Sequence, residues 1–227
     1  MHVVVTGATG GIGAAVVRQF RDRGDDVLAV ARPSSALDEL CAETGATPAP
    51  VDLLTPTDLP SVLTELALLD LLVHAAGISE VASVEQTPYE LWQQTYATNL
   101  TGPAELTRTL LPALRAARGR VVFINAAPGL RSIPRWGAYV GSKVALTELA
   151  ESLRREEAPH GVRVTSIYPR GVATELLRKV RGDLGIPYDP ALCVSPASLA
   201  VVIAGIVDAP ADVEITDVSL EPPPVLQ

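Results

Sequence analysis

A tyrosine and a lysine four residues apart are the side chains in this sequence best suited to acid–base chemistry. Tyr139 and Lys143 lie at the start of a predicted helix, where a spacing of four places both on one helical face. An ammonium group beside a phenol stabilises the phenolate and lowers the phenol pKa from about 10 towards neutrality. Such a phenol can exchange a proton at pH 7. The alternative is that both side chains are ordinary and exposed.

The scarcity of lysine favours the chemical interpretation. Lys143 and Lys179 are the two lysines among 18 basic residues. Arginine would be expected at a position that only solvates the surface, so a compact ammonium group is indicated at position 143.

A glycine-rich turn near the N-terminus could hold a phosphate. The segment TGATGGIG, residues 6–13, lies between a short apolar run and an amphipathic one. Glycines permit a tight turn and a close approach of the backbone to a pyrophosphate, while the following helix supplies N–H groups and a favourable dipole. A turn that merely tolerates glycine is the alternative, but the position between strand and helix favours a dinucleotide site. The residues assigned to it are Gly7, Thr9, Gly11, Ile12 and Gly13.

The end of the second apolar run bears on the choice of dinucleotide. It reads ARPSS at residues 31–35, with Arg32 and no acidic residue. An acid here would accept a hydrogen bond from the ribose 2′-OH of NAD, whereas a basic residue suits the 2′-phosphate of NADP. The sequence therefore favours NADP(H) over NAD(H), with Thr9 and Ser34 able to add neutral hydrogen bonds. The alternative is that Arg32 is a solvated surface charge.

The elements that must position these residues alternate along the chain. Apolar runs at 3–5, 27–30, 71–73, 121–124 and 162–167 have strand length and no alternation, which is typical of strands buried on both faces of a parallel sheet. A last strand is predicted at 213–220 and an extended tail at 221–227. Repeated strand–helix alternation predicts a doubly wound α/β sheet with right-handed crossovers.

Ser195-Pro196 predicts the start of a late helix, with serine as N-cap and proline at the first helical position. Helical spacing also identifies the packing faces of the segments between the strands. Three sets of apolar residues each fall on one helical face. They are Ile12, Val16 and Phe20; Leu106, Leu110 and Leu114; and Val144, Leu149 and Leu153.

Composition limits the classes of function. The 227 residues are 48% hydrophobic and carry a net charge of −8, so we expect one domain, 1–227, that binds neither nucleic acid nor a membrane surface. Cys41 and Cys193 match no metal-ligand spacing, and no metal site is predicted. Neither a basic leader nor an apolar run of roughly 20 residues is present, so a cytoplasmic location is expected. The irregular stretch 175–196 is the candidate for a substrate lid.

The order of motifs resembles that of the short-chain dehydrogenase/reductase family over nearly the whole chain. The resemblance rests on six segments in sequence. They are TGATGGIG at 6–13, similar to TGxxxGIG; Asp52-Leu53, similar to the adenine-contacting acid; HAAG at 74–77, similar to Asn-Asn-Ala-Gly; Asn99-Leu100, similar to the helix asparagine; Tyr139-x3-Lys143, similar to the active pair; and 169–174, similar to Pro-Gly-x-x-x-Thr.

The resemblance implies one Rossmann-type domain with a doubly wound, mostly parallel sheet of about seven strands and helices on both faces. It implies that Tyr139 protonates a carbonyl or deprotonates an alcohol, that Lys143 holds the nicotinamide ribose and tunes Tyr139, and that the Asn99 carbonyl holds a water. Hydride would pass between the nicotinamide and the substrate carbon. Asp52 could instead cap a turn, and Asn99 could cap or kink a helix. Further cofactor contacts are implied for Asp52, Leu53, Ala75, Ala76, Gly77, Pro169 and Thr174.

One catalytic position departs from the family. The family places a serine thirteen residues before its tyrosine, where it hydrogen-bonds the substrate oxygen, and this chain has Ala126 there. Losing one such donor typically costs about 10²–10³-fold in rate and leaves cofactor binding intact. Three interpretations follow: an active enzyme in which Tyr139, a water or a substrate hydroxyl replaces the donor; one in which Asn125 replaces it; or a catalytically weak NADP-binding sensor or interaction protein. An NADPH-dependent ketone or aldehyde reductase is favoured.

Smaller departures leave further alternatives open. Arg170 replaces a glycine and could reach a cofactor phosphate or project into water, while His74 replaces an asparagine and could be a satisfied strand-end histidine. In the family geometry Leu130, Ile133 and Trp136 would line the substrate side, which favours an apolar carbonyl, although they could simply pack beneath the lid. Leucine-rich helices around 92–114 and 144–153 resemble those that pair between family subunits, which predicts a homodimer or homotetramer.

Overall fold

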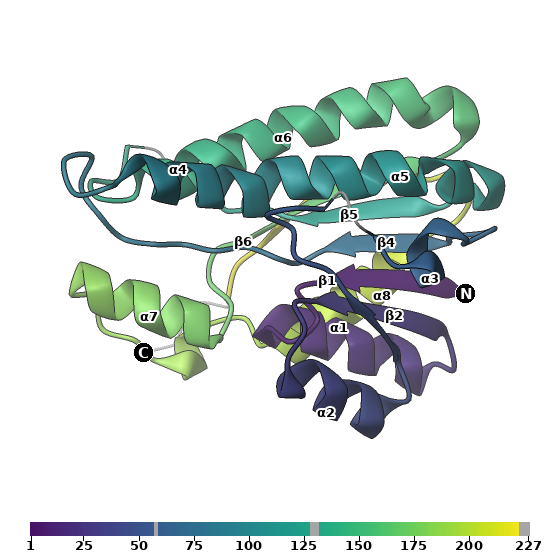
Figure 1. Ribbon diagram of the computed structural model, residues 1–227, viewed down its shortest axis with the longest axis horizontal. Coiled ribbons are helices and arrows are strands. Elements are labelled where there is room, and N and C mark those ends of the chain that lie inside the picture. The colour runs from purple at the N-terminus through teal and green to yellow at the C-terminus, as the bar shows by residue number, and fades with distance from the viewer. Residues whose placement is uncertain (57–58, 128–131, 223–227) are drawn as a thin grey trace.

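The computed structural model describes residues 1–56, 59–127 and 132–222. Across these residues seven strands form one parallel sheet in the order β3-β2-β1-β4-β5-β6-β7, with helices on both faces (Figure 1). The predicted doubly wound α/β fold is therefore confirmed. The strands are β1 His2–Thr6, β2 Asp26–Ala31, β3 Thr47–Pro50, β4 Leu71–His74, β5 Arg120–Ile124, β6 Arg163–Pro169 and β7 Asp217–Leu220.

The helices divide between the two faces of the sheet. One face carries α1 Gly11–Asp22, α2 Ser35–Thr44 and α8 Pro196–Val207. The other carries α3 Ser61–Thr64, α4 Tyr89–Tyr96, α5 Gly102–Ala117 and α6 Gly137–Glu157, with a π-helical turn, Ala97–Thr101, joining α4 to α5. The remaining helix, α7 Glu175–Leu184, lies beyond the end of the sheet (Figure 1).

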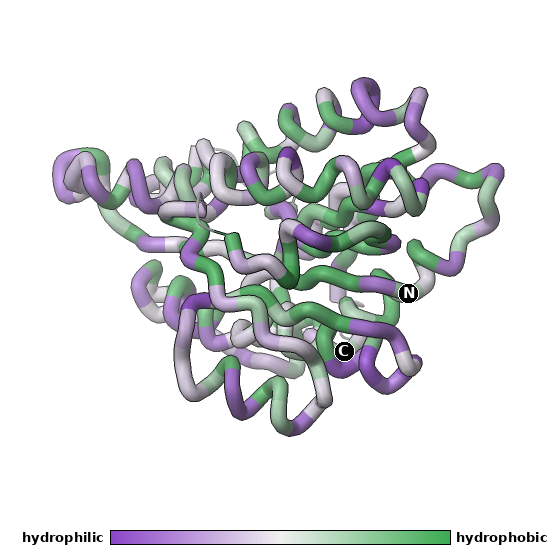
Figure 2. The backbone as a smooth tube through the Cα atoms, turned by 45° about the vertical axis from the view of Figure 1, so that its right-hand side comes forward, coloured by the Kyte–Doolittle hydropathy of each residue, from purple (hydrophilic) through white to green (hydrophobic). Residues whose placement is uncertain are grey.

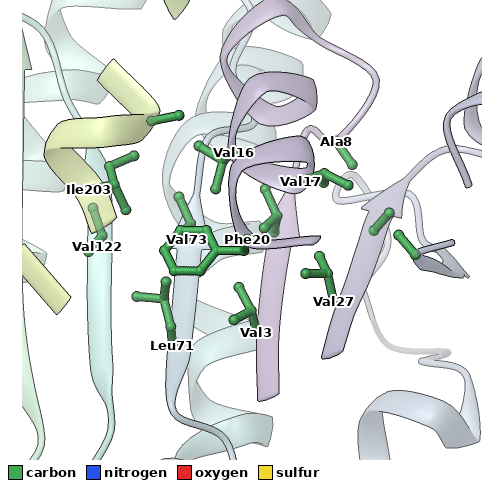
Figure 3. Close-up of a cluster of buried hydrophobic side chains, with 14 of the residues drawn as sticks. Val3, Ala8, Val16, Val17, Phe20, Val27, Leu71, Val73, Val122 and Ile203 are labelled. Atoms are coloured by element: carbon green, nitrogen blue, oxygen red, sulfur yellow. The ribbon is translucent and has the colours of Figure 1, made fainter. Parts of the chain in front are cut away.

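Alternate strand residues build a separate core on each face, as the period of two in a strand requires. On the α1 side, Val16 and Phe20 pack with Val3 and Val73 of the strands and with Ile203 of α8 (Figure 3). On the α5 side the predicted leucine face is fully buried against the sheet. Hydrophobic colour accordingly concentrates in the strands and hydrophilic colour at the outer helix surfaces (Figure 2).

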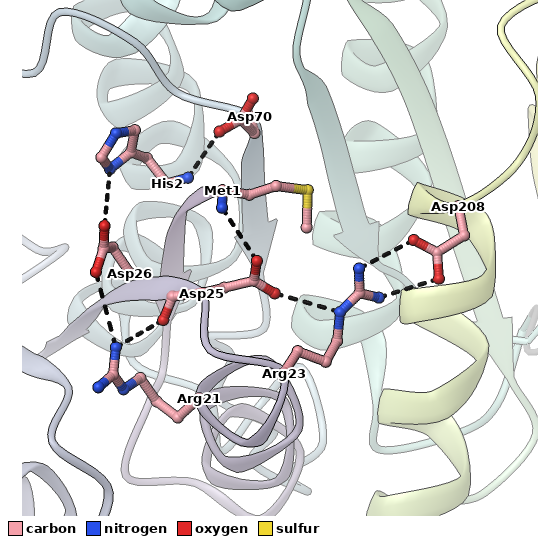
Figure 4. Close-up of polar contacts among 8 residues, drawn as sticks. All are labelled: Met1, His2, Arg21, Arg23, Asp25, Asp26, Asp70 and Asp208. Carbon is pink, nitrogen blue, oxygen red and sulfur yellow. Dashed lines mark hydrogen bonds and ion pairs between the residues drawn. The ribbon is translucent and has the colours of Figure 1, made fainter.

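A network of ion pairs links the amino ends of the strands, opposite the strands' carboxyl ends. The amino group of Met1 lies 3.1 Å from Asp25, whose other oxygen lies 3.3 Å from Arg23 (Figure 4). Arg23 also pairs with Asp208 at the end of α8, at 3.0 Å. Asp70, just before β4, accepts a hydrogen bond from the backbone of β1 at 2.7 Å. The strand starts are thus joined to α1 and α8.

The helix predicted at Ser195-Pro196 is confirmed, since Ser195 caps α8 by accepting from the Ser198 N–H at 3.0 Å. The face assigned to the 144–153 helix is wrong at one position. Val144 is 52% exposed, because α6 turns Lys143 and Leu146 inwards and leaves Val144 on the outer side.

Two other segments differ from their predicted form. The last strand begins at Asp217 rather than 213, because side chains of β6 bind the preceding carbonyls: Thr165 donates to Ile215 at 2.6 Å and Arg163 to Val213 at 3.3 Å. The stretch expected to be irregular contains the regular helix α7, capped by Thr174. Residues 185–195 beyond α7 are irregular, apart from a short 3₁₀ turn at Pro190–Leu192 and an isolated β-bridge between Val194 and Val172. The last five residues of the predicted tail, 223–227, lie outside the described residues.

Two helical glycines should respond oppositely to alanine. A Cβ atom at Gly13 in α1 would collide with the Gly7 carbonyl oxygen, whereas Gly205 in α8 has open space around it. We expect Gly13→Ala to lower the free energy of unfolding by about 1–3 kcal/mol through overpacking. Gly205→Ala should raise it by about 0.5–1 kcal/mol through helix propensity. Urea unfolding checks both, and two changes of the same sign would contradict this packing.

Candidate active site

The candidate site lies where the strand order reverses. Thr6, at the carboxyl end of β1, pairs with Val30 on one side and His74 on the other. The connections after β1 and β4 run in opposite directions from this point, which is where open α/β sheets bind ligands. Two cavities open there, one of about 420 Å³ towards β2 and one of about 130 Å³ towards β5 and β6. The segment Ala75 to Gly77 lines both cavities and forms their common wall.

The glycine turn is held against the backbone after β4. Gly7 has a φ of +64°, and a Cβ atom there would lie 2.7 Å from the backbone N and Cα of Ala76. The Ala76 N–H donates to the Thr6 hydroxyl at 3.2 Å. A side chain at Gly7 would therefore separate the two segments that form the crevice.

The predicted glycine-turn residues divide by role. Gly7 and Thr9 line the larger cavity, and Ile12 lines the smaller one. Gly11 and Gly13 line neither. Gly11 packs against Thr174, where a Cβ atom would lie 2.8 Å from the threonine methyl group, and Gly13 allows α1 to start directly above the turn.

The far end of the larger cavity contains the residues assigned to the adenosine half of a cofactor. Arg32, Asp52 and Leu53 all line it. The Arg32 side chain is exposed and has no ion pair in the described part of the chain. Asp52 also caps its own turn, because a side-chain oxygen accepts from the Leu54 N–H at 3.0 Å. The capping alternative for Asp52 is therefore observed, and its contact with an adenine stays a prediction.

The smaller cavity brings the predicted acid–base pair together. Tyr139 and Lys143 of α6 line it with Ala126, Pro169 and Thr174. Burial raises the pKa of Tyr139 to about 12 and lowers the pKa of Lys143 to about 8. The expected lowering of the Tyr139 pKa by its neighbour is not found, because desolvation dominates and the Lys143 ammonium donates to the Ile124 carbonyl at 2.8 Å.

Asn99 connects this pair to the loop after β4. Its side-chain oxygen accepts from the Ile78 N–H at 2.9 Å, and its amide donates to the Ile78 carbonyl and to the Ser142 hydroxyl, each at 3.0 Å. Ser142 in turn donates to the Tyr139 carbonyl at 2.7 Å. The buried Asn99 side chain thus braces the first turn of α6 against the crevice. Sequence reasoning missed Ser142, whose signal was its position directly before Lys143.

Position 126 offers no hydroxyl, and its neighbour is already engaged. Ala126 lines the smaller cavity. The Asn125 amide donates to Thr147 at 3.0 Å, and its oxygen accepts from the Ala126 N–H at 2.9 Å. These bonds hold the Asn125 side chain to α6 and to its own turn and leave one N–H of its amide without a partner among the described residues, so Asn125, which also lines the cavity, stays an alternative donor.

The sequence matches the short chain dehydrogenase family over residues 1–185. The chain belongs to the short-chain dehydrogenase/reductase family. It is 34% identical over 198 residues to dehydrogenase/reductase SDR family member 7B of Bos taurus, covering 80% of this chain and 61% of that protein. It is 32% identical over 191 residues to L-fucose dehydrogenase of Mus musculus, covering 82% and 70%. The closed form of serine dehydrogenase complexed with NADP⁺ aligns with a TM-score of 0.84 at 26% identity, covering 98% and 95%.

Two departures from the short-chain dehydrogenase pattern have structural explanations. His74 is buried, its Nε2 lies 2.8 Å from the Thr107 hydroxyl, and its ring stacks on Phe123 at 4.9 Å. It lines neither cavity, which supports a structural role, but its buried Nδ1 has no hydrogen-bond partner among the described residues, so the ring is satisfied at one nitrogen only. Arg170 lines the smaller cavity but pairs with Glu221 at 3.3 Å, so its guanidinium is engaged at the surface.

The three residues expected on the substrate side differ in whether they line the smaller cavity. Trp136 lines the smaller cavity, and its ring stacks on Tyr139 with centroids 4.8 Å apart. Ile133 is partly exposed and is not among the lining residues. Leu130 lies outside the described residues. Sequence reasoning missed Ser79, which lines this cavity two residues after the HAAG segment.

The described residues contain neither a candidate membrane-spanning helix nor a candidate metal cluster. None of the described helices is both long and apolar enough to cross a membrane. No group of three or more His, Cys, Asp and Glu side chains with the geometry of a metal site occurs among the same residues.

His74 should make the stability of the protein depend on pH below neutrality. Burial, with a smaller contribution from Lys143, lowers its pKa from 6.5 to about 3. The unfolded chain therefore binds a proton that the folded chain does not, and stability falls as pH drops from 6.5 towards 3. By pH 5 this amounts to about 2 kcal/mol.

The comparison is with His74→Asn, which has no titrating ring. Between pH 7 and pH 5, wild type should lose about 2 kcal/mol more of its unfolding free energy than the variant does. Urea unfolding at both pH values measures the difference. Equal losses in the two proteins would contradict a buried, neutral His74.

Proposed function

We propose that the protein is an NADP(H)-dependent oxidoreductase that interconverts a carbonyl and an alcohol, acting as a reductase of ketones or aldehydes. The observation that carries the proposal is that two neighbouring cavities share one wall. Tyr139 and Lys143 line the smaller one, Arg32 lines the larger one, and Ala75 to Gly77 line both. An extended dinucleotide spanning both would bring its nicotinamide to the phenol and its 2′-phosphate to the guanidinium.

The residues present fit such a cofactor. The N-cap of α1 is Gly10, which lines the larger cavity and supplies no side-chain cap, so the N–H groups of the first turn are left for an anion. Arg32 is uncommitted to any acid among the described residues, as a partner for a phosphate must be. Asp52 and Leu53 would hold the adenine, while Ile12, Pro169 and Thr174 would surround the nicotinamide. Bound nicotinamide would supply or accept the hydride.

Tyr139 would act as the acid in the direction of reduction. With a pKa of about 12 its phenol keeps its proton at pH 7 and can donate it to a substrate oxygen as negative charge develops there. Lys143, with a pKa of about 8, is mostly protonated at pH 7, and its ammonium would hold the ribose hydroxyls and favour the phenolate once the proton has left. The Asn99 carbonyl, in the π-helical turn, would hold the water that returns protons.

The lining of the smaller cavity supports an apolar substrate. Leu176, Leu177 and Val180 of α7 face it together with Val172 and Trp136. The two cationic side chains that line it are Lys143 and Arg170, and Arg170 is paired. We therefore propose a small ketone or aldehyde with apolar substituents, covered by α7 as a lid.

A second candidate function is favoured by one observation, the alanine at position 126. Without a donor to the substrate oxygen, the same fold would bind NADP(H) and turn over slowly, as a sensor or an interaction protein. The two candidates differ in whether turnover depends on the Tyr139 phenol, which the Tyr139→Phe variant tests.

We also propose that the protein forms a homodimer or homotetramer through the α4, α5 and α6 side. Val144 on α6 is 52% exposed, and Tyr89 on α4 is 71% exposed. Apolar side chains exposed on a helix surface of this kind are suited to pairing with a second copy.

Tyr139→Phe should lower kcat for NADPH-dependent reduction of apolar ketones and aldehydes by about 10²–10⁴-fold, because it removes the general acid. NADPH affinity should stay unchanged. Tyr89→Phe is the matched control, since Tyr89 is exposed and lines neither cavity. Initial rates and NADPH fluorescence titration measure the two quantities. Equal, negligible rates for wild type and Tyr139→Phe with NADPH still bound would favour the second candidate.

Arg32→Asp should weaken NADPH binding by at least about tenfold, because it removes a charge-assisted hydrogen bond to the 2′-phosphate and adds repulsion. NADH binding should change far less. Arg155→Asp makes the same charge change at an exposed position on α6 outside both cavities. Dissociation constants for both dinucleotides would decide, and proportional losses for NADPH and NADH would refute the assignment.

A further inference from the structure

Ser79 places a hydroxyl in the cavity that holds the acid–base pair. It lies in the loop after β4, is 2% exposed, and lines the smaller cavity together with Tyr139 and Ala126. Its Oγ accepts a hydrogen bond from the indole N–H of Trp136 at 2.6 Å. A buried polar side chain thus faces the space where a substrate would lie.

The hydrogen-bond inventory of this hydroxyl leaves its proton free. A serine hydroxyl can donate once and accept twice, whereas an indole nitrogen can only donate. The bond from Trp136 therefore fills one acceptor position on Ser79. The Ser79 O–H itself has no acceptor among the described residues. Burying a donor without a partner is costly, so a ligand oxygen in the cavity would satisfy it.

Trp136 also fixes where this hydroxyl lies relative to the phenol. Its ring stacks on Tyr139 with centroids 4.8 Å apart and planes 17° apart, while its nitrogen holds Ser79. The indole occupies the N-cap position of α6, directly before the helix that carries the acid–base pair. One rigid ring therefore positions Ser79 and Tyr139 on the same cavity.

We propose that the Ser79 hydroxyl donates a hydrogen bond to the substrate carbonyl oxygen, in place of the hydroxyl that Ala126 lacks. This rests on the proposed carbonyl reduction. A donor held in place before the reaction stabilises charge as it develops on the oxygen, which is the contribution that the alanine removes. The cavity would thus have its hydroxyl in the loop after β4 rather than in the turn after β5.

The test uses paired variants so that loss of the hydroxyl is separated from damage to Trp136. Ser79→Ala alone leaves a buried indole N–H without an acceptor. Trp136→Phe removes that N–H and keeps an aromatic ring beside Tyr139, so Trp136→Phe and Ser79→Ala/Trp136→Phe differ only in the hydroxyl. Ser79→Thr keeps a hydroxyl, and Ala126→Ser is made in wild type and in Ser79→Ala. Kinetics of apolar carbonyl reduction and NADPH affinity are measured for each.

The proposal expects kcat to fall by about 10²-fold in Ser79→Ala and to fall comparably between the two Trp136→Phe proteins. NADPH affinity should be unchanged throughout. Ser79→Thr should retain most activity, and adding Ala126→Ser to Ser79→Ala should raise kcat at least tenfold. Equal kcat in the two Trp136→Phe proteins would overturn the proposal, because Ser79 would then serve only the indole.

Failure of the proposed carbonyl reduction would give a different set of rates from failure of the Ser79 proposal. If wild type and Tyr139→Phe have the same negligible rate, and Ala126→Ser adds none, carbonyl reduction itself is wrong and this role falls with it. If Ala126→Ser raises wild-type kcat tenfold or more, carbonyl reduction stands and Ser79 is not the donor.

Discussion

The contact between two backbone turns, after β1 and after β4, is the constraint on which the site depends. Gly7 lies so close to Ala76 that no Cβ atom fits between them, and the Thr6 hydroxyl holds the Ala76 N–H. The larger cavity opens on one side of this contact and the smaller on the other, with Ala75 to Gly77 as their common wall. Widening the contact would separate the glycine turn from the wall that the two cavities share.

Around this contact the protein buries groups that water would otherwise solvate. The Lys143 ammonium is 7% exposed and binds the Ile124 carbonyl, while the Asn99 side chain is 1% exposed and satisfied at both ends. The low pKa of Lys143 and the high pKa of Tyr139 are consequences of that burial. Burying these polar groups costs free energy. Hydrophobic packing on both faces of the sheet, and the ion pairs at the amino ends of the strands, offset that cost.

Much of the fold followed from local pattern. The five apolar runs are strands, and Leu106, Leu110 and Leu114 form a buried face, because long continuous periodicity reports burial directly. The hydrophobic pattern was less informative where the contacts of a particular side chain decide the local structure. Val144 points outwards because Lys143 must point inwards, and β7 is short because β6 side chains take the carbonyls before it. The helix α7 was missed because the glycines and prolines around it, of which Gly185 ends it, suggested irregular chain.

The sequence alone determined the family, the sheet and the placement of Tyr139 and Lys143 on one face of a helix, since all of these depend on residue types at fixed spacing along a strand or helix. Only the tertiary structure decided which groups share a cavity. It brought Ser79 beside Trp136, 57 residues away, and engaged Asn125 with Thr147, 22 residues away. It also made desolvation, rather than the neighbouring ammonium, set the pKa of Tyr139. Burial and long-range contacts are properties of the packed molecule, and no local spacing encodes them.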